Sequence, residues 1–292
     1  MDTLRNRAMI EKANTYAVVV WYHPTEEQCA SIRSYMEAVK QVIIVDNTPA
    51  DNRALVGVLP KGRYVYLPLG ANKGIATALN VGCRKAIEEG AEWILTMDQD
   101  SRWEKEQLKR YFELANAYPE REQVGVFSPR QHYSGHMPQY QHEYEEQIAV
   151  MTSGCLISVS GFEATGGFRD EFFIDEVDNE YCMHCRRLGM KVVIVNHALL
   201  EHRLGELRTI RFLGIWPKEY IDHAPFRFYY ITRNILYLNQ LYPEHARFNN
   251  KRLKKAIKRI VLYDRRHKWS ALRMCWLGWQ DYKHHKMNQF NH

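Results

Sequence analysis

Two carboxylates one residue apart follow an apolar run near the first third of the chain. The run Trp93–Met97 is typical of a buried strand, and Asp98 and Asp100 come directly after it. Carboxylate oxygens are the ligands that Mg²⁺ and Mn²⁺ prefer, with water and phosphate oxygens completing the shell. Asp-x-Asp also arises by chance and suits the first turn of a helix. Its position at the end of a strand favours a metal site.

Two further groups have residue types that suit catalysis. His202 follows the last apolar run before the C-terminal region, and imidazole is a ligand for Mn²⁺, although a lone histidine is more often structural. Farther upstream stands an acidic cluster that consists of Asp175, Glu176, Asp178 and Glu180. Carboxylates favour the first turn of a helix, where they complement its dipole. One of them could instead be a general base, since like charges beside a metal drive pKa values apart.

The elements that must position these residues alternate between strand and helix. Strands are expected at Tyr16–Tyr22, Gln41–Val45, Arg63–Leu67, Trp93–Met97 and Val124–Ser128, with helices from Thr25, over Ile75–Glu89 and over Glu104–Tyr118. This alternation predicts an α/β fold with a mostly parallel sheet flanked by helices. Ligands of such sheets bind outside the carboxyl ends of the strands. Those ends carry Asp46, Asn72 with Gly74, and Asp98 with Asp100.

Composition excludes several classes of protein. The chain has 292 residues, of which 46% are hydrophobic and 25% charged, as in folded globular domains rather than disordered chains. No uncharged apolar run is long enough for a membrane span, and residues 1–12 lack an apolar signal region. Six irregularly spaced cysteines do not form a secreted disulfide pattern, and Cys182 and Cys185 have metal or redox spacing without a second pair. We therefore expect a soluble cytoplasmic protein.

Glycine patterns exclude two nucleotide-binding classes. Gly70 and Gly74 surround Lys73, but the Walker ending Gly-Lys-Ser/Thr is absent, and no Gly-x-Gly-x-x-Gly follows the first strand. The sequence therefore does not favour an ATPase or a Rossmann dehydrogenase.

Several short motifs, in order over about 190 residues, resemble the family 2 glycosyltransferases and most closely their rhamnosyltransferase-like branch. The motifs are Val45–Thr48, Asn72–Ala76 with Asn80, Asp98–Ser101, Thr152–Gly154, Gly166–Arg169, Phe173–Glu180 and Glu201–Gly205. The segment Tyr229–Asn234 is similar to the family's first helix after the catalytic domain. The resemblance implies the GT-A fold and a nucleotide-sugar donor.

The same resemblance implies a role for each matching residue. Asp178 would be the catalytic base, and Asp100 with His202 would hold Mn²⁺ or Mg²⁺. Asp46 would form a hydrogen bond with the pyrimidine base. The other residues implied at the nucleotide and donor sugar are Asn47, Asn72, Lys73, Gly74, Asp98, Gln99 and Gly154. Residues 1–222 would be the nucleotide-sugar-binding catalytic domain and residues 223–292 a helical basic C-terminal region.

The resulting hypothesis is an inverting glycosyltransferase. The favoured sugar is L-rhamnose from dTDP-rhamnose, and the expected acceptor is a lipid-linked glycan in cell-surface polysaccharide synthesis. One rival is a metal-dependent nucleotidyltransferase, but Trp21–Pro24 after the first strand offers no glycine-rich basic loop. The other rival is a nucleic-acid-binding protein that uses the basic C-terminal region, although no recognised nucleic-acid motif accompanies it.

The C-terminal region is strongly basic. Residues 244–292 contain 13 Lys/Arg and three Asp/Glu, a net charge of +10 within a chain of net charge +6. Apolar residues recur at helical spacing from Leu253 to Val261, and Trp269, Trp276 and Trp279 follow among further cations. This composition suits a helix at an anionic membrane surface, hence a peripheral protein on the inner face of the membrane. A helix packed on the catalytic domain and a dimer interface are the alternatives.

Overall fold

The computed structural model describes residues 8–132, 140–202, 207–212, 216–221, 224–262, 267–287 and 289–290. For residues 202, 207–212 and 216–221 it describes the backbone alone. The chain forms two compact units. The first contains Met1–Asp170 and Asp178–Arg203, and the second contains Glu171–Val177 and Leu204–His292. The second unit thus includes Asp175 and Glu176 of the acidic cluster and the chain from Leu204 on. The expected domain ranges 1–222 and 223–292 stay a prediction. Residues 222 and 223, at the expected boundary, lie outside the described residues.

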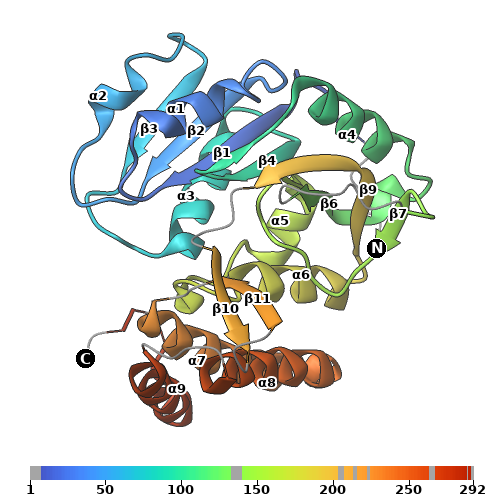
Figure 1. Ribbon diagram of the computed structural model, residues 1–292. Helices are drawn as coiled ribbons and strands as arrows, with labels where there is room; N and C mark the ends of the chain where they lie inside the picture. The colour runs from blue at the N-terminus through green and yellow to red at the C-terminus, as the bar shows by residue number, and fades with distance from the viewer. Residues whose placement is uncertain are drawn as a thin grey trace. The chain divides into compact units, whose positions relative to one another are not determined.

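The first unit is built on a mixed sheet, which in the described residues has nine strands (Figure 1). Its first four strands are parallel, in the order β3-β2-β1-β4. They are β1 (Thr15–Trp21), β2 (Gln41–Asp46), β3 (Tyr64–Pro68) and β4 (Trp93–Asp98). All seven residues of β1 are buried, as expected of a central strand covered on both faces. The α/β fold is therefore confirmed.

The other half of the sheet contains antiparallel pairs. β8 (Cys155–Ser158) is antiparallel to β4 and to β6 (Val124–His132), and β6 is parallel to β9 (Lys191–His202). Two short strands, β5 (Ser101–Arg102) and β7 (Tyr144–Glu146), pair with β9. The sequence did not reveal β5 or β7, because two or three residues carry no periodic signal.

Helices cover both faces of the sheet (Figure 1). The apolar core on one face joins Ala17, Val19 and Trp21 of β1 to α1 (Glu26–Arg33) and α4 (Lys105–Ala117). Helix α3 (Ile75–Glu88) packs on the other face, where Gly82 lies so close to Val18 that an added Cβ would be 2.4 Å from its Cγ1. The remaining helices of this unit are α2 (Arg53–Val56), α5 (Val159–Thr165) and most of α6 (Val177–Arg187).

The second unit is mainly helical, as expected of the C-terminal region. An antiparallel hairpin of β10 (Leu207–Phe212) and β11 (Trp216–Ile221) precedes α7 (Pro225–Leu241), α8 (Ala246–Leu262) and α9 (Lys268–Lys283). Helix α7 packs against both α8 and α9 (Figure 1). Among the helices that the structure describes, none has both the length and the apolar character needed to cross a membrane.

Candidate functional site

The parallel strands bring the expected donor-binding residues to one edge of the sheet. β1 pairs with β2 and with β4, in registers that set Trp21 opposite Asp46 and Val20 opposite Asp98. Asp46 and Asp98 are the last residues of their strands. The sheet edge that sequence reasoning selected is therefore formed as expected.

Asp46 is fully buried and holds the turn that follows β2. Its Oδ1 accepts a hydrogen bond from the backbone N–H of Thr48 at 3.1 Å. Its Oδ2 accepts from the Tyr66 hydroxyl at 2.6 Å and from the Asn52 amide at 2.9 Å. Burial, and then the bond to Asp46, raise the pKa of the Tyr66 hydroxyl, so Tyr66 keeps the proton that it donates. Sequence reasoning missed Tyr66 and Asn52, because nothing in their spacing marks them.

Two asparagines join the turn after β2 to the turn before α3. The Asn47 amide donates to Asn72 Oδ1 at 3.1 Å, and Asn47 Oδ1 accepts from the backbone N–H of Lys73 at 2.7 Å. Asn72 Oδ1 also accepts from the backbone N–H of Gly74 at 3.1 Å. Gly74 has φ of +86°, which suits glycine at this turn. Four of the expected nucleotide-lining residues thus form one hydrogen-bonded network.

The turn after β4 is held from two sides. The Gln99 side chain accepts from the Tyr22 backbone N–H at 2.7 Å and donates to the Tyr22 carbonyl at 3.2 Å, which ties the turn to the end of β1. The Asp98 backbone N–H donates to Ser153 Oγ at 3.1 Å, and Ser153 Oγ donates to Ser101 Oγ at 2.7 Å. Both serines are buried. They are supporting residues that the Asp-x-Asp pattern alone did not select.

The expected metal ligands lie at this turn and on the neighbouring strand. Asp98 and Asp100 are half-buried, and β5 pairs with β9 in a register that sets Ser101 opposite His202. The His202 side chain lies outside the described part of the chain, and within that part no group of three or more His, Cys, Asp or Glu residues forms a metal site. Carboxylate oxygens beside an imidazole-bearing strand position fit the donor set of Mn²⁺ or Mg²⁺.

Asp178 accepts hydrogen bonds from the next residue in the sequence. Its Oδ1 accepts from the backbone N–H of Asn179 at 2.8 Å and from the Asn179 side chain at 3.0 Å. The other three acids of the cluster pair with arginines, as Asp175 with Arg227, Glu176 with Arg252 and Glu180 with Arg169. Asp178 is half-buried in the first turn of α6.

The thiol of Cys155 in β8 is buried. Its pKa is raised well above the usual range, first by burial and then by Cys182, with further contributions from the charges of Asp178 and Asp98. Asp178 and Asp98 both belong to the first unit.

Position 154 requires glycine because of its backbone conformation and its close neighbours. Its φ is +78°, and a Cβ at this position would lie 2.8 Å from Leu200 Cδ2 and from Pro129 Cγ. Its backbone N–H donates to the Thr96 carbonyl at 2.7 Å, next to Asp98.

We expect Gly154→Ala to lower the free energy of unfolding by about 2–4 kcal/mol, since it combines left-handed backbone with overpacking. Gly62→Ala is the matched control, because Gly62 has the same φ of +78° with no atom within 4 Å of the added Cβ. Urea unfolding of both variants separates the two costs. Equal losses for the two would contradict the packing argument.

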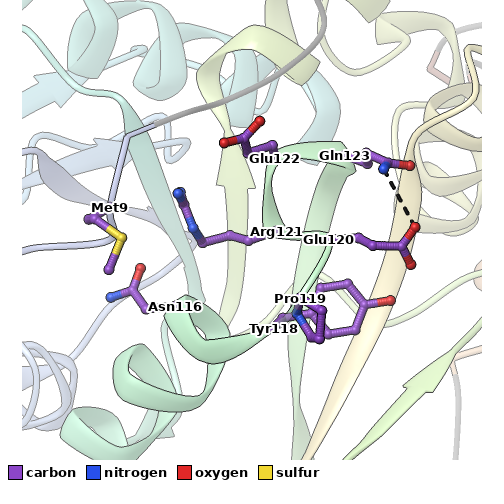
Figure 2. A pocket seen from close by; sticks show the side chains of 8 residues that line it. All are labelled: Met9, Asn116, Tyr118, Pro119, Glu120, Arg121, Glu122 and Gln123. Atoms are coloured by element: carbon purple, nitrogen blue, oxygen red, sulfur yellow. Dashed lines mark hydrogen bonds between the residues drawn. The ribbon is translucent and has the colours of Figure 1, made fainter.

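A shallow pocket in the first unit lies away from these residues. It is lined by Met9, Asn116, Tyr118, Pro119, Glu120, Arg121, Glu122 and Gln123, and Figure 2 shows Glu120 and Gln123 facing each other across one side. The loop that forms most of it enters β6, which runs in the same direction as β4 because both are antiparallel to β8. The pocket therefore lies at the amino end of the strands, opposite the edge that carries Asp46 and Asp98.

Sequence comparison shows the kind of protein that carries this site. A model of "Glycosyl transferase family 2" matches residues 26–194. The chain is 32% identical over 247 residues to the "dTDP-rhamnosyl transferase RfbF" of Shigella flexneri, covering 77% of this chain and 80% of that protein.

Solved structures share the fold. The structure of residues 1–349 of S. aureus TarS in complex with UDP-GlcNAc aligns with a TM-score of 0.59 at 14% identity, over 89% of this chain and 79% of that one. The structure of GalNAc-T7 with UDP, GalNAc and Mn²⁺ aligns with a TM-score of 0.53 at 12% identity, over 65% of this chain but only 44% of that one.

The fold and the sequence similarity define a glycosyltransferase of the GT-A type, an enzyme that takes its sugar from a nucleotide-sugar donor. The chain belongs to glycosyl transferase family 2, and within it is rhamnosyltransferase-like. The expected family is confirmed; the roles expected of individual residues remain predictions.

Proposed function

We propose that this enzyme transfers L-rhamnose from dTDP-rhamnose to a hydroxyl group of a glycan, with inversion at the anomeric carbon. The observation that carries the proposal is the 32% identity, over 77% of the chain, to a protein named a dTDP-rhamnosyl transferase. The position of Asp178 is compatible with the same chemistry, since it is a half-buried carboxylate in the first turn of α6 and belongs to the unit that carries Asp46 and Asp98.

In this mechanism Asp178 acts as the general base. It accepts the proton of the acceptor hydroxyl while the hydroxyl oxygen attacks the anomeric carbon from the face opposite the diphosphate. The bond to the diphosphate breaks in the same displacement, so no covalent intermediate with the enzyme forms, unlike in a retaining glycosidase. Asp175, Glu176 and Glu180 are held in ion pairs with Arg227, Arg252 and Arg169, so these three carboxylates have structural roles of their own.

The donor would lie along the sheet edge. Asp46 would recognise the thymine base, and the Asn47–Asn72 network with Lys73 and Gly74 would line the nucleoside. Asp98 and Gln99 would face the ribose and the phosphates, and Gly154 the sugar. Asp100 and His202 would hold Mn²⁺ or Mg²⁺. When bound, that ion supplies positive charge against the negative charge that develops on the departing diphosphate.

A panel of nucleotide-diphosphate sugars tests the donor assignment. We expect dTDP-rhamnose, with Mn²⁺ or Mg²⁺ present, to raise the melting temperature of the full chain more than UDP-GlcNAc or UDP-GalNAc at equal concentration, because tighter binding to the folded state stabilises it more. Slow release of dTDP by donor hydrolysis is the second readout. A larger shift with a UDP-sugar would overturn the assignment to dTDP-rhamnose and leave the glycosyltransferase class intact.

The acceptor of this proposal is a lipid-linked glycan that the enzyme meets at an anionic membrane surface. Three tryptophans of α9 are exposed, with Trp269 at 81%, Trp276 at 52% and Trp279 at 39%. Their spacing sets them on one side of the helix, beside the exposed cations Arg273 and Lys283. Tryptophan at headgroup depth with cations on anionic lipid is the pattern of interfacial helices.

The apolar residues of helix α8 lie partly in the core of the second unit and partly at its surface. Ile260 is fully buried, in a cluster with Phe228 and Ala271, so part of the apolar face stabilises the second unit itself. Ile257 and Val261, on the same expected face, are 38% and 44% exposed. The expected apolar face is therefore divided between internal packing and solvent.

We expect the full chain to float with anionic vesicles of phosphatidylglycerol at low salt and to dissociate as the salt concentration rises. The double variant Trp269→Ser with Trp276→Ser should remain in solution, since both side chains are exposed and neither is needed in a core. Val58→Ser, which changes a 58% exposed side chain of the first unit, is the control. Equal flotation of the double variant and the parent chain, or none by either, would contradict the membrane surface.

A further inference from the structure

The segment just before Asp178 has an unusual backbone. Phe173, Asp175 and Glu176 have φ of +60°, +61° and +67°, in the left-handed region that residues other than glycine rarely adopt. Three such residues within four positions cost free energy that surrounding contacts must offset. The segment Glu171–Val177 belongs to the second unit, and Val177 is the first residue of α6, so one peptide bond joins the segment to Asp178.

Two adjacent residues of α7 hold this backbone. The Asn234 side-chain amide lies within hydrogen-bond distance of three carbonyl oxygens, those of Phe172 at 3.0 Å, Ile174 at 2.9 Å and Asp175 at 2.8 Å. Arg233 Nη2 donates to the carbonyl of Glu171 at 3.1 Å. Arg233 Nε donates to Asn234 Oδ1 at 2.9 Å, which orients the amide toward the segment. Both side chains have 0% exposure.

The side chains of the segment are held as well. Arg227 of α7 binds the Asp175 carboxylate with two nitrogens, at 2.5 Å and 3.2 Å. Arg252 of α8 pairs in the same way with Glu176, whose side chain is 4% exposed. The Phe173 ring stacks on Tyr230 with centroids 5.4 Å apart. Backbone and side chains are thus fixed by residues far along the sequence.

We propose that Arg233 and Asn234 are positioning residues for Asp178: they impose the left-handed course of Glu171–Glu176 and thereby set the start of α6 and the direction of the Asp178 carboxylate. This proposal rests on the proposed role of Asp178 as the base. Left-handed residues other than glycine persist only where surrounding contacts offset their cost, and here those contacts come from α7 and α8. A base must be held within a fraction of an ångström of its proton, and such accuracy needs supporting residues that are themselves fixed.

The test is a double-mutant cycle in the full chain, with kcat for transfer and KM for dTDP-rhamnose measured on an acceptor that the parent enzyme uses. We expect Asn234→Ala to lower kcat by about 10- to 100-fold and to leave KM for the donor within about twofold. In the Asp178→Asn background the same substitution should lower kcat by less than about twofold, because the group that it positions is already absent.

Two more variants keep the test decisive. Arg227→Gln removes the two hydrogen bonds that hold the Asp175 carboxylate. The Arg227 side chain is 35% exposed, so this variant should fold even where Asn234→Ala does not. We expect it to lower kcat by a smaller factor, with the same dependence on Asp178. Asn239→Ala is the control, since it removes a 2.8 Å bond from Asn239 of α7 to Asn250 of α8 that involves no residue of Glu171–Glu176, and it should leave kcat unchanged.

The outcomes separate this proposal from the proposed function. If Asp178→Asn abolishes most transfer while Asn234→Ala and Arg227→Gln keep the parent kcat, or lose the same factor in both backgrounds, the positioning role is overturned and the base stands. If Asp178→Asn itself transfers sugar at the parent rate, the role of Asp178 as base is overturned first.

Discussion

We expect Asp178→Asn to lower kcat for sugar transfer by about 100-fold or more, with the dissociation constant for the nucleotide-sugar donor changed by less than about twofold. A general base contributes about 10²- to 10⁴-fold, and an amide of the same shape cannot accept the acceptor's proton. The donor contacts that we propose lie on other elements, at the ends of β2 and β4, so the substitution would not remove them. Steady-state kinetics with saturating donor, together with calorimetric titration of the donor, measure the two quantities separately.

The control for this substitution is Glu163→Gln, which removes one negative charge from an exposed position on α5 in the same unit. It should leave both kcat and donor affinity unchanged. A loss of less than about tenfold in kcat for Asp178→Asn, or a parallel loss of donor affinity, would show that the carboxylate caps α6 rather than acting as a base.

The second large effect is expected at the turn after β4. Asp100→Asn should lower kcat/KM by about 100-fold or more, because a metal ion contributes several kcal/mol of charge stabilisation to the transition state. Excess EDTA should reproduce the loss in the parent chain, and Mn²⁺ or Mg²⁺ should restore it. The measurements are donor affinity and transfer rate as a function of free metal concentration.

A matched control and a folding check accompany this prediction. Glu113→Gln removes a carboxylate with a 62% exposed side chain from α4 and should respond to EDTA as the parent chain does. Asp100 is half-buried, Ser153 and Gln99 form hydrogen bonds that hold the same turn, and an amide has the shape of the carboxylate, so we expect Asp100→Asn to fold with a melting temperature close to that of the parent chain in the absence of metal. Full activity of the parent chain in excess EDTA would overturn the assignment of Asp100 as a metal ligand.

The strands and helices of the first unit could be read from the sequence for a physical reason. A buried strand such as β1 must be apolar along its whole length, and α3 must place apolar residues at helical spacing, so both leave a local pattern. The carboxyl ends of parallel strands meet at one edge, so the positions of Asp46 and Asp98 followed from the same pattern. The family was indicated by short motifs in a fixed order, and sequence comparison confirmed it. The alternation of strands and helices by itself does not identify the family.

Pairings between residues distant in sequence leave no local pattern, and tertiary structure alone decided them. The short strands β5 and β7 exist because β9 offers them an edge, and Tyr66 bonds Asp46 because the register of two strands brings them together. The residues that support the turns, such as Ser153, are ordinary in type and spacing.

The acidic cluster has one feature that the sequence predicted and others that only the tertiary structure decided. The sequence by itself determined that Asp175, Glu176 and Asp178 stand at the start of a helix, since the change from apolar to acidic residues is local. The ion pairs of two of them depended on arginines more than 50 residues away, because only the fold brings Arg227 to Asp175 and Arg252 to Glu176. The left-handed backbone there was equally invisible, since its free-energy cost is offset by buried side chains of α7 that local sequence cannot report.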